Sequence, residues 1–315
     1  MSTNQRVIAL GFFDGVHTAH GALLRRVKEA AAERNAVPAA FTFDCHPSAR
    51  LSGRSVPLLT SVEDREFLMR SQYGMEEILV ASFDEMMNMP WEEFITGYLA
   101  KEQGAVHVVC GYDFRFGWRG EGNPERLKAK CAELGIGCDV IGAIELDGVR
   151  VSSTYIRSLI EQGEMERAAA FLGHPHILSD LVTPGKHLGR TLGFPTVNLH
   201  FQPGVIVPAY GVYAAKVYLE DGSEQIAVVN VGVRPTVEEV SQPNIEAFLL
   251  DFDGDLYGQR VRVAFYRHLR GERKFPSVEA LTREVLRNAE ETRAYWETEG
   301  GDKILQAQVP LGGKS

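Results

Sequence analysis

The chain has 315 residues, a length that accommodates two ordinary domains with separate cores. Its formal net charge of −9 disfavours broad contact with nucleic acid or with anionic membrane surfaces. The four cysteines show no C-x-x-C spacing, the N-terminus has no charged start followed by an apolar region, and no apolar run approaches the length of a membrane span. We therefore expect a soluble cytoplasmic protein with reduced thiols that binds neither nucleic acid nor membranes; composition leaves a homo-oligomer open.

The first half of the chain alternates apolar runs with amphipathic runs. Strands are expected at 6–12, 37–43, 76–82, 105–110 and 138–143, with helices at 17–34, 61–72, 90–102 and 123–135. This alternation predicts a parallel sheet that is covered on both faces. Ligands of such sheets bind beyond the carboxyl ends of the strands, so the first strand-to-helix turn, at 11–20, is a candidate site.

The pattern changes after about Phe171, where short β-rich runs replace the alternation. Residues 210–232 predict a hairpin with Asp221 and Gly222 at its turn. A long helix is expected from about Ser277, with one apolar face made of Val278, Leu281, Val285, Ala289 and Trp296. These features predict a small β-barrel with one packed helix, and we expect the tail 301–315 to be disordered.

Two histidines, His17 and His20, stand three residues apart where a helix is expected to begin. They share one helix face, and Gly11 and Gly15 allow the preceding turn to approach a ligand closely. A helix N-terminus favours phosphate, and imidazoles there could donate to its oxygens. Taken alone, however, the pair is more simply explained as the polar start of a helix.

Two further segments of the first half carry polar chemistry. The run VSSTYIR (151–157) offers three hydroxyls that either cap a helix or bind phosphate, with Arg157 one turn further in. The run GYDFRFG (111–117) follows an expected strand and combines aromatic with charged side chains. That combination suits an aromatic ligand with a polar handle, although packing could also account for its two phenylalanines.

Together with FDCHP (43–47), these segments resemble, in the same order, the motifs of the N-terminal half of bifunctional bacterial riboflavin kinase/FAD synthetases. The resemblance implies a nucleotidyltransferase that joins FMN to the α-phosphate of ATP and releases pyrophosphate. It assigns His17, His20 and Arg157 as catalytic and places ATP and its transition state on Gly11, Phe13, Gly15, His17, His20, Ser153, Thr154 and Arg157. It implies that the flavin or adenine ring system of the substrates binds beside Asp44, Asp113, Phe114 and Phe116.

Two residues of the first half depart from the family pattern. Ala19 stands where the family has a glycine between the histidines, and Cys45 stands where proline is usual. A Cβ at position 19 is harmless in helical backbone and strained at positive φ. Since position 19 falls at an expected helix start, we expect adenylylation to survive.

In the second half, the run GKHLGRTLGFPTVNL (185–199) combines glycines with cations, which can wrap phosphates through backbone N–H groups, although no P-loop motif occurs. Thr196 and Asn198 would project to one side of an extended segment as hard-oxygen ligands for Mg²⁺, or serve as ordinary turn residues. Glu246 lies in an apolar run, where it is either at a strand edge, the commoner case, or in a cleft accepting a proton.

This half is similar to riboflavin kinases through GRTLGFPTVN, VNVGVRPT, IEAFLLDFDGDLYG and RGERKF. The resemblance implies that Thr196 and Asn198 hold Mg²⁺ with ATP and that Glu246 accepts the proton of the riboflavin 5′-hydroxyl. Asn288 stands where the last helix of the family often has an acidic residue. The resemblance also assigns the ATP phosphates to Gly185, Gly189, Arg190 and Gly193, and the flavin to Arg270 and Phe275.

The implied fold is α/β: a Rossmann-like nucleotidyltransferase with a parallel sheet and helices on both faces (1–172), followed by a small β-barrel riboflavin kinase domain with a C-terminal helix (173–300). The expected enzyme converts riboflavin to FMN and FMN to FAD. The alternative enzyme is a riboflavin kinase with a weakened or inactive adenylyltransferase half, because of Ala19 and Cys45. A flavin-binding regulator without catalysis is the alternative from a different class.

Overall fold

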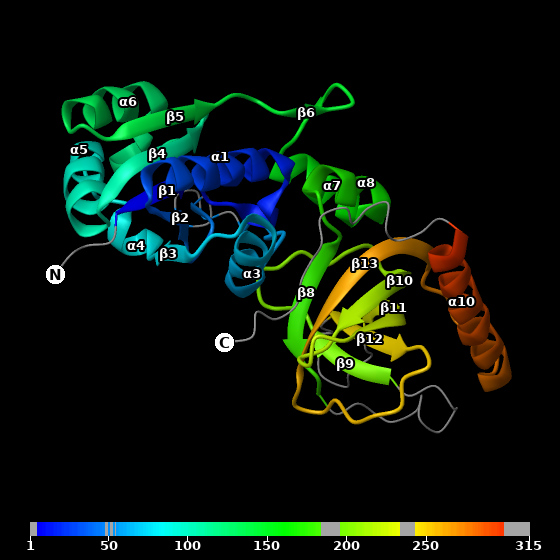
Figure 1. The fold of residues 1–315 in the computed structure, drawn as a ribbon. Coiled ribbons are helices and arrows are strands. Elements are labelled where there is room, and N and C mark those ends of the chain that lie inside the picture. Colours follow the sequence, from blue (N-terminus) through cyan, green and yellow to red (C-terminus); the bar gives the residue numbers. More distant parts are fainter. Residues whose placement is uncertain are drawn as a thin grey trace. The chain divides into compact units, whose positions relative to one another are not determined.

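The computed structural model describes residues 5–47, 50, 53, 55–183, 196–233 and 243–298 (Figure 1). Its chain divides into two compact units, the first made of Met1–Leu58 and Arg65–Ser152 and the second of Leu59–Asp64 and Ser153–Ser315. Residues 59–64 therefore belong to the second unit, although their chain neighbours on both sides belong to the first. The expected domain boundary at residue 172 stays a prediction.

The first unit is built on a five-stranded parallel sheet with the strand order β3-β2-β1-β4-β5. Nearly every residue of the three central strands is buried, so both faces of the sheet are covered, as the alternating pattern predicts. The order reverses between β1 and β4, and ligands of such sheets bind at the carboxyl ends beside that point. The strands are β1 (Arg6–Leu10), β2 (Val37–Phe43), β3 (Glu77–Ala81), β4 (Ala105–Gly111) and β5 (Gly137–Ile141).

The four helices predicted for the first unit are present as α1 (Thr18–Arg34), α3 (Val62–Tyr73), α5 (Trp91–Glu93) continued by the π-helical η2 (Phe94–Glu102), and α6 (Pro124–Glu133). The short helix α4 (Phe83–Met86) was not predicted. Short turns, η1 (Asp14–Val16) and η3 (Trp118–Gly120), and a hairpin of β6 (Glu145–Leu146) and β7 (Val149–Arg150) complete the unit. Helix α1 packs against the central strands through the predicted stripe of Leu23, Val27 and Ala31, all of them buried.

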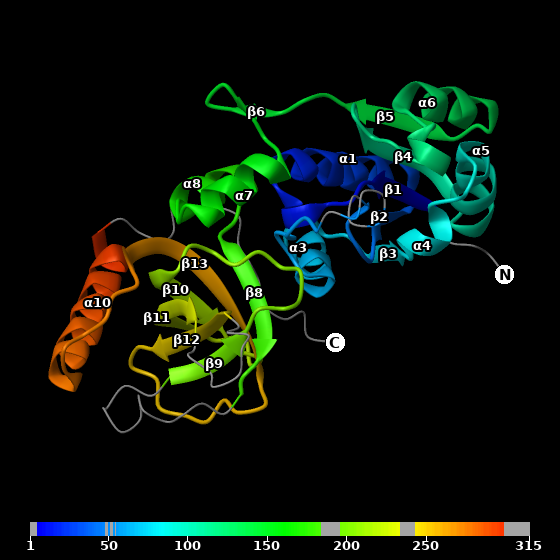
Figure 2. The ribbon, with the colours of Figure 1, turned by 180° about the vertical axis from the view of Figure 1, so that it is seen from behind.

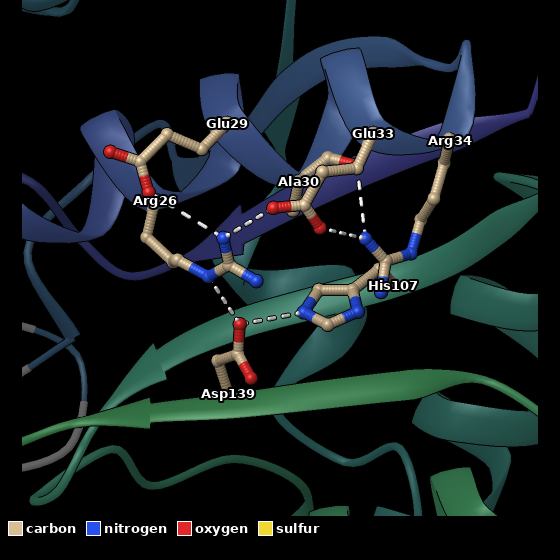
Figure 3. Close-up of polar contacts among 7 residues, drawn as sticks. All are labelled: Arg26, Glu29, Ala30, Glu33, Arg34, His107 and Asp139. Atoms are coloured by element: carbon tan, nitrogen blue, oxygen red, sulfur yellow. Dashed lines mark hydrogen bonds and ion pairs between the residues drawn. The ribbon is translucent and has the colours of Figure 1, made fainter.

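Polar contacts join α1 to the strands β4 and β5 (Figure 3). The Nε of Arg26 donates to Oδ2 of Asp139 at 2.6 Å, and the same oxygen lies 3.0 Å from Nε2 of His107. Burial raises the pKa of Asp139, but the hydrogen bonds from Arg26 and His107 outweigh it and hold the pKa below its ordinary value. This network fixes the helix whose first turn carries the predicted histidine pair.

The second unit contains a six-stranded antiparallel sheet with the order β8-β13-β10-β11-β12-β9 (Figure 2). The sheet curls, so that Thr183, just after β8, forms a bridge with Asn198 on β9. The predicted hairpin is confirmed, with Gly222 at a φ of 86° in its turn. The strands are β8 (His176–Leu181), β9 (Thr196–His200), β10 (Gly211–Tyr218), β11 (Glu224–Val233), β12 (Pro243–Leu249) and β13 (Arg260–Gly271), and the helices are α7 (Ser153–Glu161), α8 (Met165–Leu172) and α10 (Val278–Thr298).

The apolar face predicted for α10 is partly wrong. Val278 is 51 % exposed, whereas the polar side chains of Asn288 and Thr292 are buried. Ala289 packs on the sheet as predicted, in a cluster with Val212 and Val228. Asn288 is buried because α10 also covers a cavity, whose wall includes this amide; the burial of Thr292 has no such explanation.

A buried carboxylate holds residues 59–64 on the second unit. The Oδ1 of Asp64 accepts from Oγ of Ser179 at 2.5 Å, and its Oδ2 accepts from Oγ of Ser61 at 2.9 Å. The Nε of Arg262 lies 3.5 Å from Oδ1 of the same carboxylate. Each partner of this carboxylate lies in the second unit.

Among the described residues, no helix combines the length and apolarity needed to cross a membrane. The predicted phosphate-covering residues Gly185, Gly189, Arg190 and Gly193 lie outside the described residues, as does the tail 301–315. Their roles stay predictions.

Candidate active sites

The turn after β1 has an unusual backbone. Phe13, Gly15 and Val16 have φ values of 57°, 77° and 42°. A positive φ is easy for glycine but costly for a β-branched residue, and such strain gathers at functional sites. The side chains of Phe13 and Val16 are fully buried, so core packing holds the turn in this shape.

His17 and His20 lie together at the start of α1. Their rings stack with centroids 3.6 Å apart, and Nδ1 of His17 accepts from the backbone N–H of His20 at 3.3 Å. Because Nδ1 accepts, Nε2 is the ring nitrogen of His17 that carries a proton. Burial, His17 and Arg65 lower the pKa of His20 well below its ordinary value. The site thus presents two imidazoles and a helix N-terminus, all of which can donate to phosphate oxygens.

Ala19 creates no backbone strain at this site. It is the second residue of α1 and is not among the described residues with positive φ. The expectation that its Cβ lies in helical backbone is confirmed. The replacement of glycine therefore gives no structural reason for a disabled turn.

The predicted flavin-side residues have varied surroundings. Asp44 follows β2, and its Oδ1 accepts from the backbone N–H of Phe83 at 3.0 Å. Asp113 forms an exposed ion pair with Arg150 at 2.8 Å. The rings of Phe114 and Phe116 stack with centroids 5.4 Å apart, and Phe116 is packed in the core of the unit. Their contact with flavin stays a prediction.

Helix α7 begins at Ser153, so Val151 and Ser152 of the run 151–157 precede the helix and belong to the first unit, whereas residues 153–157 belong to the second. Ser153 and Thr154 stand in its first turn, and Arg157 stands one turn later. Their contact with the ATP of the first unit stays a prediction.

Two residues of the first unit were not singled out from the sequence. Arg65 and Thr42 are both fully buried beside the turn after β1. A lone arginine in an amphipathic helix is usually solvated, and a threonine in a strand is ordinary, so neither gives a sequence signal.

In the second unit, a cavity of about 310 Å³ lies between the sheet and α10. The strand register aligns five residues across the sheet in the order Arg270, Val212, Asn230, Glu246 and Asn198. Cross-strand neighbours share one face of a sheet, so this row places the carboxylate of Glu246 between two amides. The register also shows that β12 is an interior strand, which excludes the reading of Glu246 as an edge residue.

A second row adds Thr196, which stands opposite Phe248, and both residues line the cavity. Thr196 and Asn198 are two apart on β9 and share the face of Glu246, as the extended pattern predicts. The Nδ2 of Asn244 lies 3.4 Å from Oε1 of Glu246. The site therefore combines a hydroxyl, amides and a carboxylate on one face.

This donor set fits a magnesium ion. Hydroxyl, amide and carboxylate oxygens are hard ligands, and Mg²⁺ takes few of them from protein and the rest from phosphate and water. In the described part of the chain, no three His, Cys, Asp or Glu side chains form a metal cluster.

The other end of the cavity is cationic and aromatic. The Nε of Arg270 lies 3.2 Å from Oδ1 of Asn288 and 3.2 Å from Oε1 of Glu284. The guanidinium of Arg270 also lies 5.5 Å from the ring centroid of Phe275. Arg270 and Phe275, both predicted to contact flavin, thus share one wall of the cavity with Asn288. Glu284 was not singled out from the sequence, because one glutamate on a charged helix face carries no signal.

The comparisons agree with this division into two sites. A model of the FAD synthetase family matches residues 1–155, and a model of the riboflavin kinase family matches residues 172–296. The bifunctional riboflavin kinase/FMN adenylyltransferase of Bacillus subtilis is 34 % identical over 299 residues, which cover 92 % of each chain. Its counterpart in Listeria monocytogenes is 33 % identical over 294 residues, also 92 % of each chain. A crystal structure described as a macrolide-efflux protein from Streptococcus pneumoniae superposes with a TM-score of 0.80 at 28 % identity, covering 93 % of this chain and 95 % of that one.

Proposed function

The chain belongs to the family of bifunctional riboflavin kinases/FMN adenylyltransferases, and we propose how its two units divide that work. It is an enzyme with two transferase activities, one of which phosphorylates riboflavin to FMN while the other adenylylates FMN to FAD. We assign the first activity to the cavity under α10 and the second to the turn after β1.

In the kinase reaction, the flavin ring occupies the cavity beside Phe275, and the ribityl chain carries its 5′-hydroxyl to Glu246. The carboxylate accepts the hydroxyl proton as the oxygen attacks the γ-phosphorus, and ADP leaves. Thr196 and Asn198 are the protein ligands for Mg²⁺, which neutralises phosphate charge when bound. Asn230 and Asn198 flank Glu246 in the register and orient the phosphoryl acceptor.

In the adenylyl transfer, a phosphate oxygen of FMN attacks the α-phosphorus of ATP, and pyrophosphate leaves. His17 and His20 donate hydrogen bonds to the phosphates from the N-terminus of α1, where the helix dipole favours the growing negative charge. The family motif also assigns ATP to Ser153, Thr154 and Arg157 on α7, and that assignment stays a prediction. Phe13 and Gly15 hold the turn open to the nucleotide.

The observation that carries the proposal is the row that places Glu246, which lines the cavity, between the amides of Asn230 and Asn198. We expect Glu246→Gln to lower kcat for FMN formation by about 100-fold or more, because the amide cannot accept the proton. FAD formation from added FMN and ATP should stay unchanged. The matched control is Glu290→Gln, which makes the same chemical change at an exposed position of α10 outside the cavity lining.

His20→Ala is the reciprocal variant. It should lower FAD formation and leave FMN formation from riboflavin nearly intact. Chromatography of riboflavin, FMN and FAD over time measures both steps in one reaction. A wild-type enzyme that makes FMN but no FAD would instead support the kinase with a disabled first unit, and full kinase activity in Glu246→Gln would refute the assignment of the base.

A further inference from the structure

Arg65 on α3 is a fully buried cation. A buried charge is costly unless polar groups surround it. Its Nη1 lies 3.0 Å from the carbonyl oxygen of Phe12, 3.0 Å from that of Phe43 and 2.7 Å from Oγ1 of Thr42. The hydroxyl of Thr42 in turn donates to the Phe12 carbonyl at 2.7 Å. One nitrogen of the guanidinium therefore joins two segments of the first unit.

The two segments are the turns that carry the sequence motifs. Phe12 belongs to GFFDG, after β1, and Phe43 begins FDCHP, at the end of β2. The guanidinium of Arg65 also lies over the ring of Phe12 at 4.3 Å, and that ring meets His46 edge-on with centroids 5.0 Å apart. Arg65 thus contacts both the backbone and the Phe12 ring of the first turn. The same ring contacts His46 of the second turn.

The other two nitrogens of the Arg65 guanidinium, Nε and Nη2, make no hydrogen bond within the described part of the chain. Asp14 and Glu66 act favourably on its charge, while burial lowers the pKa of Arg65 to about 10, so that it stays protonated at neutral pH. The cation adds positive potential beside His20, where the ligand is expected to be a polyphosphate.

We propose that Arg65 is a positioning residue for adenylyl transfer, which locks the two motif turns to each other through the carbonyls of Phe12 and Phe43. The inference rests on the proposed function of the first unit. Arg65 acts through the turns, which hold the phosphates and the reacting FMN in line. Its loss should therefore affect the geometry of the reaction more than the binding of nucleotide.

The first test compares Arg65→Lys with Arg65→Met. Because a single nitrogen makes all three polar contacts, a lysine ammonium can replace most of them, and we expect Arg65→Lys to keep FAD formation within about 10-fold of wild type. Arg65→Met should lower kcat for FAD formation by about 100-fold while the KM for ATP changes by less than about 5-fold. Riboflavin phosphorylation, measured on the same sample, should stay within about 2-fold of wild type.

The second test does not depend on removing a buried charge. Thr42→Val removes the hydroxyl at nearly constant volume, whereas Thr42→Ser keeps it. We expect Thr42→Val to lower kcat for FAD formation by about 10-fold and Thr42→Ser to stay within about 3-fold. This pair decides the question if Arg65→Met does not fold.

The inference would be overturned if Arg65→Met left kcat for FAD formation unchanged, or if Arg65→Lys and Arg65→Met lowered it equally. It would also be overturned if Arg65→Met lowered riboflavin phosphorylation as much as FAD formation. Equal rates for Thr42→Val and Thr42→Ser would also contradict it. A wild-type chain that forms no FAD would refute the proposed function itself. Failure of the proposed function is therefore seen in the wild type, whereas failure of the inference about Arg65 is seen only in the variants.

Discussion

His176 on β8 makes the stability of the second unit sensitive to acid. Its side chain is buried, its ring stacks on Phe265 with centroids 5.8 Å apart, and its Nε2 has no hydrogen-bond partner among the described residues. Burial and the neighbouring His174 lower the pKa of His176 to about 4, although Asp64 opposes the shift. The native state therefore keeps this imidazole neutral at pH values where a free histidine is charged.

The direction of the effect follows from proton binding. In the unfolded chain the imidazole titrates near pH 6.5, so between pH 6.5 and about 4 the unfolded state binds more protons than the native state. The stability associated with neutral His176 is present above pH 6.5 and falls as the pH drops through that window. A shift of about 2.5 units corresponds to about 3 kcal/mol in full, of which about 2 kcal/mol is lost between pH 7.5 and pH 5.

Urea unfolding of the full chain tests this prediction. Trp296 is the one tryptophan of the second unit, so a Trp91→Phe, Trp118→Phe background makes fluorescence report on that unit. Between pH 7.5 and 5, the background protein should lose about 2 kcal/mol more than its His176→Gln variant. The control is His200→Gln, because the side chain of His200 is 55 % exposed. Equal pH dependence with and without His176 would refute the reasoning.

Three further predictions follow from single residues. Ala19→Gly should lower the free energy of unfolding by about 0.5–1 kcal/mol in thermal melts and leave the rate of FAD formation within about 2-fold, because position 19 is helical; a 10-fold change would contradict that backbone assignment. Asp139→Asn should cost about 1 kcal/mol in urea unfolding above pH 4, and the difference should shrink as the pH falls from the ordinary carboxyl pKa of 3.8 through the lowered pKa of Asp139. Gly211→Ala should abolish FMN formation, since a Cβ there would lie 2.3 Å from the carbonyl oxygen of Arg270, whereas the control Gly271→Ala meets no atom within 4 Å and should remain active.

The sequence predicts the helices and strands better than it predicts the side chains that line a site between them. The period of the apolar residues suffices for the parallel strands and for the packed stripe of α1, because most of the side chains buried there are apolar; Thr42 and His107 are buried exceptions on β2 and β4. The same rule fails on α10, where Asn288 is buried and Val278 is exposed, because the helix covers a cavity with mixed walls. Periodicity reports which side chains avoid water, and it carries no information on where a ligand will lie.

The candidate sites show the same limit. Thr196 and Asn198 are recognisable from spacing, but their meeting with Glu246 depends on a register between strands that are far apart in sequence. Arg65 carries no motif of its own, and its importance comes from the carbonyls that it contacts. Contacts to the backbone are invisible in a sequence, since every residue has the same carbonyl.

The placement of residues 59–64 in the second unit bears on any attempt to dissect the enzyme. A fragment that starts at residue 153 would lack Asp64, and Ser179 and Arg262 would lose the carboxylate that they share. Removing a buried acceptor costs about 1–3 kcal/mol, and more where a charge is left behind. No single cut in the gene separates two complete units, so kinase activity in an isolated C-terminal fragment will depend on adding those six residues back.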